Sequence, residues 1–377
     1  MRFCLEFIYV ILLFVFSLGF LIFFHEFGHF LAAKKAGVFV EEFGFGYPPR
    51  IIGVYKENSK LKLVFGPKEK KTKTTIYSFN LFPFGGFVKL YGENKDLGEK
   101  SFFSAKLSKR LMITSAGVIF NFFLGMLLLF FGYLIGVPRA GNSSYISNPQ
   151  IQIIGVSKDS PAKKVGLQVG DIILGVKEKD SFLNFKEIKE FQDYIKHQKG
   201  KEVILKIKRK KEEKYFSVLV RKSPPKGEGP IGIVLSKVGK FKPPFYLAGP
   251  YAIIDSFKIA STIFIFIYLI LKNLIIKKTL IAEVAGPVGI VYFGSKLSQL
   301  GLSYLLWFLA LLSINLAVIN LLPIPAADGG RMLMLLIEKI RKRRVSQKVE
   351  NLINSLGFVA IIILMIIITF KDIQRFF

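Results

Sequence analysis

The chain has 377 residues, which allows two or three domains, and 51% of them are apolar. The single cysteine, Cys4, excludes an intramolecular disulfide framework and a cysteine-rich zinc module, and we assign it no role. The formal charge is +28, but no basic-aromatic nucleic-acid module accompanies it. Because much of this charge lies in loops beside apolar segments, we expect contact with anionic membrane lipid and no nucleic-acid partner.

Four long apolar stretches predict membrane-spanning helices, because about twenty apolar residues cross a bilayer as a helix. They are residues 5–33, 111–137, 301–325 and 356–370. The first resembles a signal peptide at its start, but it lacks a small-residue cleavage site and continues into two histidines. We therefore interpret it as a retained helix. Asp255 and Lys258 interrupt the apolar segment 251–278, which favours an interfacial helix over a full span.

Two regions between the predicted spans have a strand-like alternation of apolar and polar residues. Residues 37–108 indicate four or more short strands separated by glycine and proline. Residues 140–240 contain four strand patterns and a helical segment at 184–197, which predicts one small α+β domain. By the positive-inside rule, the basic residues in the first region and at 338–344 place both loops in the cytoplasm. The insert and both termini then lie outside the cytoplasm.

The predicted fold is therefore a polytopic α-helical membrane protein with about four transmembrane helices, a membrane-associated β region and one inserted α+β domain. In chain order, the segments are a first helix (1–36), the cytoplasmic-side β region (37–108), a second helix (109–138), the insert (140–240), an interfacial helix and loop (244–300), a third transmembrane segment (301–337) and a fourth helix (350–373).

The stretch His25-Glu26-Phe27-Gly28-His29 lies inside the first predicted span and forms an H-E-x-x-H motif. Residues four apart share one helix face, so both imidazoles can reach one metal ion. Glu26 can act as general base towards a water molecule on that metal. Ionisable side chains in a membrane span are costly without a partner, and a divalent cation supplies one. Two imidazoles with an oxygen ligand suit Zn²⁺.

The third metal ligand must come from elsewhere in the chain. His197 lies in the predicted insert, and we expect it to be a surface histidine. Asp328 follows a Pro-x-Pro break at the end of the third span and precedes two glycines. Irregular backbone at membrane depth is tolerated where it lines a cavity. We predict Asp328 as the third ligand, although it could also serve as the N-cap of the next helix.

Together with the N-x-x-P-x-P-x-x-D-G-G stretch of residues 320–330, the H-E-x-x-H motif resembles the site-2 protease family of intramembrane zinc metalloproteases, peptidase family M50. The bacterial regulator of sigma-E protease branch is the nearest match. The resemblance extends over most of the chain, through residues 36–50, 79–93, 115–122 and 286–290. It implies that His25, His29 and Asp328 bind zinc and that Glu26 is the catalytic base.

The resemblance also implies a set of substrate-binding residues. Asn320, Pro323 and Pro325 would position an unwound substrate beside the metal. Gly44, Phe45 and Gly46 match the G-x-G of a re-entrant loop, where a substrate strand could be held by β-augmentation. A simple tight turn is the alternative for these three residues.

The insert resembles a bacterial PDZ domain, because residues 160–176 contain the S-P-A, G-L and G-D-x-I pattern. PDZ domains bind extended peptides at a sheet edge, and in this family the domain resembles a gate above the active site. The chain has room for one such domain. It also departs from the family at Ala327, where leucine is common, and at Arg331, where some members have histidine. We assign Arg331 no catalytic role.

These residues favour an intramembrane zinc endopeptidase in the bacterial inner membrane. Its active site would lie near the cytoplasmic side. The resemblance implies single-pass membrane protein substrates, such as anti-sigma factors or remnant signal peptides. Two other functions are a metal or ion transporter, because intramembrane His and Asp mark ion pathways, and a catalytically silent PDZ scaffold. The absence of apparent inverted repeats disfavours the transporter, and the intact Glu26 disfavours the scaffold.

Overall fold

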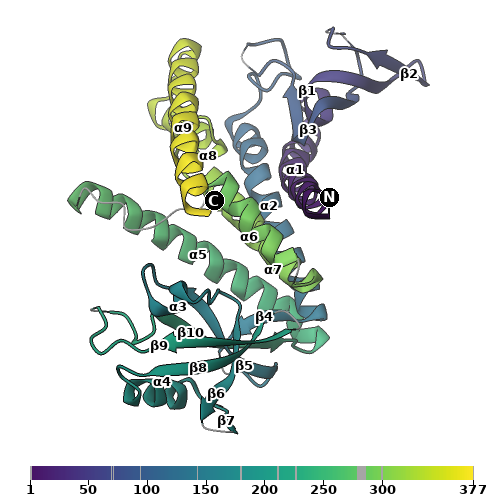
Figure 1. Cartoon of the computed structure of the whole chain (residues 1–377). Coiled ribbons are helices and arrows are strands. Elements are labelled where there is room, and N and C mark those ends of the chain that lie inside the picture. Colours follow the sequence, from purple (N-terminus) through teal and green to yellow (C-terminus); the bar gives the residue numbers. More distant parts are fainter. Residues whose placement is uncertain are drawn as a thin grey trace. The chain divides into compact units, whose positions relative to one another are not determined.

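The computed structural model describes residues 2–376 apart from 69, 71, 94, 142, 179–180, 210–211, 226, 278–285 and 299. Residues 278–285 of the predicted interfacial segment thus lie outside the described part of the chain. The chain forms two compact units (Figure 1). One comprises residues 1–131 and 249–377, and the other comprises residues 132–248.

Long apolar helices dominate the first unit. The helices outside the insert are α1 (Arg2–Ala36), α2 (Leu107–Ile135), α5 (Phe245–Lys277), α6 (Pro287–Ser298), α7 (Leu302–Leu321), α8 (Asp328–Arg341) and α9 (Gln347–Phe376). Among the described residues, five helices are long and apolar enough to cross a membrane, in α1, α2, α5, α7 and α9. The α5 stretch Phe245–Asn273 joins the four predicted spans on this criterion. Its interfacial placement stays a prediction.

These five helices differ in how much of their apolar surface other parts of the protein cover. The apolar windows of α1, α2 and α7 are each 39% buried, whereas those of α5 and α9 are 6% and 0% buried. Leu21 of α1, Leu124 of α2 and Phe308 of α7 meet in one buried cluster. A helix that is apolar on all sides requires an apolar environment around it. The α5 and α9 helices therefore present the surfaces most suited to lipid.

The loop between α1 and α2 forms a three-stranded antiparallel sheet, in the order β2-β1-β3. Its strands are β1 (Val40–Glu57), β2 (Lys60–Phe65) and β3 (Ile76–Leu90). The expectation of four or more short strands is wrong, because β1 and β3 are long and bend at several bulges instead of ending. Gly46 and Gly85 have φ values of +80° and +74°, a conformation that glycine adopts readily, so they sit inside bent strands.

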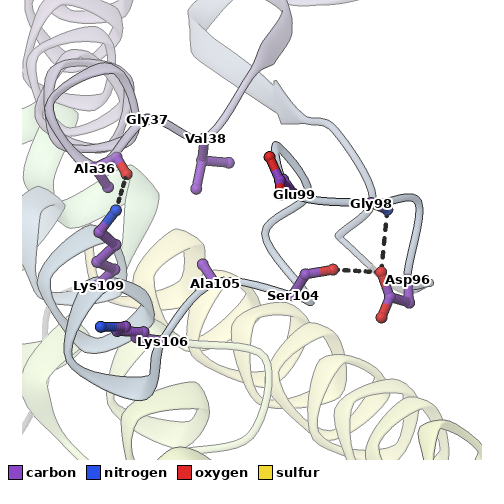
Figure 2. A pocket seen from close by; sticks show the side chains of 10 residues that line it. All are labelled: Ala36, Gly37, Val38, Asp96, Gly98, Glu99, Ser104, Ala105, Lys106 and Lys109. Carbon is purple, nitrogen blue, oxygen red and sulfur yellow. Dashed lines mark hydrogen bonds between the residues drawn. The ribbon is translucent and has the colours of Figure 1, made fainter.

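The end of α1 is fastened to the start of α2 beside a cavity of about 480 Å³ (Figure 2). Lys109 Nζ donates to the carbonyl oxygen of Ala36 over 2.7 Å, which satisfies a carbonyl at the C-terminal end of α1. The loop on the other side is held by Asp96, whose Oδ1 accepts from the Gly98 amide over 3.1 Å and from the Ser104 hydroxyl. The Lys109 contact therefore joins the end of α1 to the start of α2, and the Asp96 contacts hold the loop before α2.

The C-terminal helix is joined to the segment before the third predicted span. Asp372 of α9 is 2% exposed, and its Oδ2 accepts a hydrogen bond from the Gly289 amide over 2.7 Å. Gly289 lies in the first turn of α6, where amide groups lack helical partners. The buried carboxylate of α9 thus accepts a hydrogen bond from a backbone amide in the first turn of α6.

The second unit contains a seven-stranded sheet with the order β4-β10-β5-β6-β8-β9 and with β7 paired to β6. Its elements are β4 (Val137–Ala140), β5 (Ile146–Val156), α3 (Pro161–Lys164), β6 (Ile172–Glu178), β7 (Ser181–Leu183), α4 (Ile188–His197), β8 (Glu202–Arg209), β9 (Glu212–Leu219) and β10 (Ile233–Phe241). The four strand patterns of the sequence coincide with β5, β6, β8 and β9, and the helical pattern coincides with α4. Leu205 and Phe191 lie in its buried core.

Asp171 joins three parts of this unit. Its side chain is 1% exposed and accepts two hydrogen bonds of 2.7 Å from the Arg209 guanidinium and one of 2.8 Å from the Gln168 amide. The hydrogen bonds to Asp171 raise the pKa of Arg209. The ion pair joins the residue before β6 to the last residue of β8.

Asp171→Ala should destabilise the second unit by about 2 kcal/mol, because it removes hydrogen bonds to a charged group and leaves the Gln168 amide without its acceptor. The effect is measured as the urea midpoint of unfolding of the full chain. Protease cleavage within residues 132–248 reports the unfolded fraction at each urea concentration. Asp193→Ala is the matched control, because its pair with Lys196 is an exposed contact of 3.3 Å. Equal unfolding midpoints for the two variants would contradict this role.

Candidate metal centre

His25 and His29 face the same side of α1, as their spacing of four residues requires. Each residue is 8% exposed, and the ring centroids lie 4.8 Å apart. Their Nε2 atoms are 3.1 Å from each other. Two lone-pair-bearing nitrogens this close, in a buried apolar surrounding, need a shared cation or proton between them.

Asp328 completes a cluster of three metal-ligating groups. Its Oδ2 lies 2.9 Å from His25 Nε2 and 3.2 Å from His29 Nε2. Ligand atoms bound at 2.0–2.1 Å to one tetrahedral zinc ion lie about 3.3 Å apart. The three observed separations are near that value, so the residues fit a zinc ion with a fourth position open. Among the described residues, these three form the one group of His, Cys, Asp or Glu side chains close enough together to hold a metal ion.

The turn between α7 and α8 aims Asp328 at the histidines. Asp328 is the first residue of α8, and Ala327 occupies the N-cap without a side-chain hydrogen bond. A Cβ atom on Gly329 would collide with the carbonyl oxygens of Leu321 and Leu322. The missing side chain at Gly329 therefore lets α8 begin against the end of α7. From the sequence, Asp328 could be a metal ligand or an N-cap. In the structure Ala327 is the N-cap, and the Asp328 carboxylate contacts the histidines.

Two ion pairs fix α8 against the rest of the unit. Arg110 of α2 donates to both carboxylate oxygens of Glu338 over 3.0 Å, and both side chains are largely buried. Arg331, one turn after Asp328, pairs with Glu93 over 2.6 Å. Both ion pairs join α8 to residues outside it, so they restrain the helix that carries Asp328.

Helix α2 contacts both histidine rings without contributing a ligand to the cluster described above. The His29 Nδ1 atom lies 2.8 Å from the carbonyl oxygen of Ile113. A carbonyl can only accept, so Nδ1 carries the proton and Nε2 keeps a lone pair for a metal. A Cβ atom on Gly117 would lie 2.5 Å from His25 Nε2 and closer still to His29 Nε2. Only glycine at position 117 leaves room for both rings.

Glu26 lines a cavity of about 460 Å³ together with His29 and Asp328. Tyr47, Pro48, Gly86, Phe87 and Val88 of the β sheet form another wall of this cavity, and Ala326 and Arg331 also line it. Carboxylate, imidazole and arginine groups therefore face one space that reaches the sheet. This arrangement can hold water and an extended peptide beside the metal ligands.

The candidate substrate residues Gly44, Phe45 and Gly46 lie in β1, immediately before the cavity-lining pair Tyr47 and Pro48. The Gly46 carbonyl accepts from Asn80 Nδ2 over 2.9 Å, and Asn80 is fully buried. The Phe45 ring stacks on that of Phe79, with centroids 5.7 Å apart. The glycines are thus part of a bent strand, which differs from the tight-turn alternative.

Asn320 lies in the last turn of α7, and Pro323 and Pro325 lie in the turn before α8. A Cβ atom on Gly357 would collide with Pro325, so this proline packs directly against α9. The neighbouring Ala326 amide donates to Asn354 Oδ1 of α9 over 3.2 Å. In the structure, therefore, contacts with α9 help to shape the turn that leads to Asp328.

His197 belongs to the second unit, at the end of α4. It is exposed, and its Nδ1 donates to the carbonyl of Asp193 over 2.7 Å. Sequence reasoning found the three clustered side chains but missed Ile113 and Gly117. The run Ser115–Phe122 contained both a glycine and an asparagine inside an apolar helix, which was the available signal for close packing.

A buried histidine pair with a carboxylate, and a glutamate beside it, defines the metal centre of an H-E-x-x-H metalloprotease. The profile of Peptidase family M50 matches residues 13–364. The chain belongs to this family and is a zinc metalloprotease. With its apolar helices, it is a multi-pass membrane protein.

Curated relatives match almost the whole chain. A protein of Clostridium perfringens, named as a putative zinc metalloprotease, is 31% identical over 357 residues, covering 94% of this chain and 95% of its own. The zinc metalloprotease RasP of Shouchella clausii is 28% identical over 455 residues, covering 97% and 99%. Among solved structures, the PDZ domain of an SdrC-like protein from Listeria monocytogenes matches 24% of this chain and 90% of its own, with 28% identity and a TM-score of 0.21.

Gly117→Ala should weaken zinc binding by about 10–100-fold, the range seen when groups that orient metal ligands are altered. The new methyl group must displace one or both histidine rings. Titration of the purified protein with zinc against a competing chelator measures the affinity.

Gly249→Ala in α5 is the control, because a Cβ atom there meets nothing within 4 Å. It should bind zinc as the wild type does. Equal zinc affinity of Gly117→Ala and the wild type would show that the rings do not need the space at position 117.

Proposed function

We propose that the protein hydrolyses peptide bonds within the transmembrane segments of single-pass membrane proteins, with zinc held by His25, His29 and Asp328. The observation that carries this proposal is the position of the cluster. Two of its members lie in α1, a candidate membrane span, and the third lies within hydrogen-bonding distance of both. A substrate segment in the bilayer can therefore meet the ligands at its own depth.

His25, His29 and Asp328 would hold the zinc ion, which would polarise the scissile carbonyl and lower the pKa of a water molecule towards neutrality. The chain's own residues provide the remaining chemistry. Glu26, beside His25 and in the same cavity as His29 and Asp328, takes the proton of the attacking water. It then transfers that proton to the amine of the leaving peptide. The Ile113 carbonyl keeps the His29 ring in the tautomer that can bind metal.

A helical substrate must unwind before its carbonyls are accessible, and the β sheet can hold the unwound segment. Tyr47 and Pro48 bring β1 to the metal cavity, directly after Gly44, Phe45 and Gly46. Because Gly44 and Phe45 already pair with β3 on both sides, a peptide would add by β-augmentation at β3, where Gly86, Phe87 and Val88 line the same cavity and each pair with β1 on one side. Asn320, Pro323 and Pro325 would position it from the turn before α8.

The finer points of this function rest on the family resemblance and on the distribution of charge. The active site would lie near the cytoplasmic face of a bacterial inner membrane, because Lys34 and Lys35 end α1. The PDZ-like insert would face the other side and filter substrates or bind a peptide. Anti-sigma factors and remnant signal peptides are the proposed substrate classes.

Glu26→Gln should retain bound zinc and lose cleavage by about 10²–10⁴-fold, because it removes the general base and no metal ligand. Elemental analysis measures the zinc, and a model transmembrane substrate in detergent or liposomes measures the cleavage. His25→Ala is the companion variant, which should lose both zinc and cleavage.

Full cleavage by Glu26→Gln would contradict the assigned base. A wild-type protein that binds zinc but cleaves no transmembrane substrate would instead favour the transporter or scaffold functions. Zinc uptake into liposomes separates those two, since only a transporter moves the ion.

A further inference from the structure

One buried side chain of α2 contacts a proposed metal ligand but has no place in the proposed function. Asn121 is 1% exposed, and its amide lies against His25. Ile113, Gly117 and Asn121 follow each other at intervals of four residues, so they share one face of α2. Ile113 meets His29, and Asn121 meets His25, so α1 and α2 run antiparallel at this point. One face of α2 thus contacts both rings.

The side-chain oxygen of Asn121 has no hydrogen-bond partner among the described residues. The Nδ2 atom of Asn121 lies 3.3 Å from His25 Nδ1, whereas Oδ1 is buried without a hydrogen-bond partner among the residues that the structure describes. A buried amide oxygen left unpaired costs about 1–3 kcal/mol. A half-turn about the last side-chain bond exchanges the amide oxygen and nitrogen without moving any other group.

The chemistry of the ring favours the exchanged orientation. A histidine that gives its Nε2 lone pair to a metal carries its remaining proton on Nδ1. That N–H requires an acceptor, and an amide nitrogen cannot accept. If Nδ2 faced the ring, Nδ1 would have to accept, and the ring proton would occupy Nε2 in place of the metal. With its oxygen towards the ring, Asn121 accepts the hydrogen bond from Nδ1–H, and its amide nitrogen takes the buried position that Oδ1 now occupies.

We propose that Asn121 is a positioning residue that accepts a hydrogen bond from His25 Nδ1–H and so keeps Nε2 of His25 free to bind the metal. This role matches that of the Ile113 carbonyl towards His29. Helix α2 then orients both histidines, through a side chain for one ring and a backbone carbonyl for the other. The inference rests on the proposed zinc site.

The position of Asn121 is itself fixed from α7. Ser313 Oγ is fully buried and donates to the Asn121 backbone carbonyl over 2.7 Å. One turn further along α2, a Cβ atom on Gly125 would lie 2.5 Å from Ile314 of α7, so the two helices pack closely there. The amide is therefore held on a rigid helix, which is what an orienting group beside a metal ligand requires.

The test compares zinc affinity, measured with a competing chelator, among three variants of position 121 in the full chain. Asn121→Leu and Asn121→Ala remove the acceptor, and Asn121→Asp keeps an oxygen acceptor of the same size. The first two should bind zinc about 10–100-fold more weakly, and the aspartate variant should bind within about threefold of the wild type. Asn273→Leu in α5 is the control, since this exposed amide donates to the Leu269 carbonyl of its own helix, and the variant should bind zinc as the wild type does.

A purely structural role would lower the thermal unfolding temperature of Asn121→Leu and Asn121→Ala without changing the zinc affinity of the folded fraction, which would overturn the inference. So would an aspartate variant that binds as weakly as the alanine variant. If Asn121→Leu does not fold, the alanine and aspartate variants decide the question. If the wild type itself binds no zinc, the proposed function fails first. If the wild type and the three Asn121 variants bind zinc equally, only the role of Asn121 fails.

Discussion

The close approach of three polar side chains inside apolar helices is the constraint on which the rest of the structure depends. His25, His29 and Asp328 lie within 2.9–3.2 Å of one another at positions that exclude most water. A bound cation would offset the cost of burying such a group, as in the proposed zinc site. The contacts of Asp328 with the two histidines also join α1 to α8, two helices about three hundred residues apart in the sequence.

Glycine makes these approaches possible. Gly117 lets α2 lie beside the two rings, Gly28 lets it meet α1 at Ala116 and Phe120, and Gly329 lets α8 start against the end of α7. Small residues at helix contacts serve the same purpose in membranes generally, because packing replaces the hydrophobic effect there. Around this tightly packed centre, α5 and α9 leave their apolar surfaces uncovered. The structure thus combines a tightly packed candidate metal centre with a surface suited to lipid.

The chemistry of the site was predictable from the sequence, but its surroundings were not. Two histidines four apart with an intervening glutamate predict a metal site in a membrane helix, and Asp328 was the acidic residue at a broken span. The orienting groups escaped prediction for a physical reason. A backbone carbonyl such as that of Ile113 has no sequence signature, and Asn121 is informative only once the register of α1 against α2 is known. The β region showed the same limit, because its glycines bend long strands instead of ending short ones.

The sequence by itself determined the apolar helices, the H-E-x-x-H face of α1 and the family, because these depend on local periodicity and on residue chemistry. Only the tertiary structure decided how the parts meet. It brought Asp328 to the histidines instead of leaving it as a helix cap, placed the strand after Gly46 at the metal cavity, and turned one face of α2 towards both rings. Contacts between distant segments depend on packing and register, which no local pattern of residues specifies.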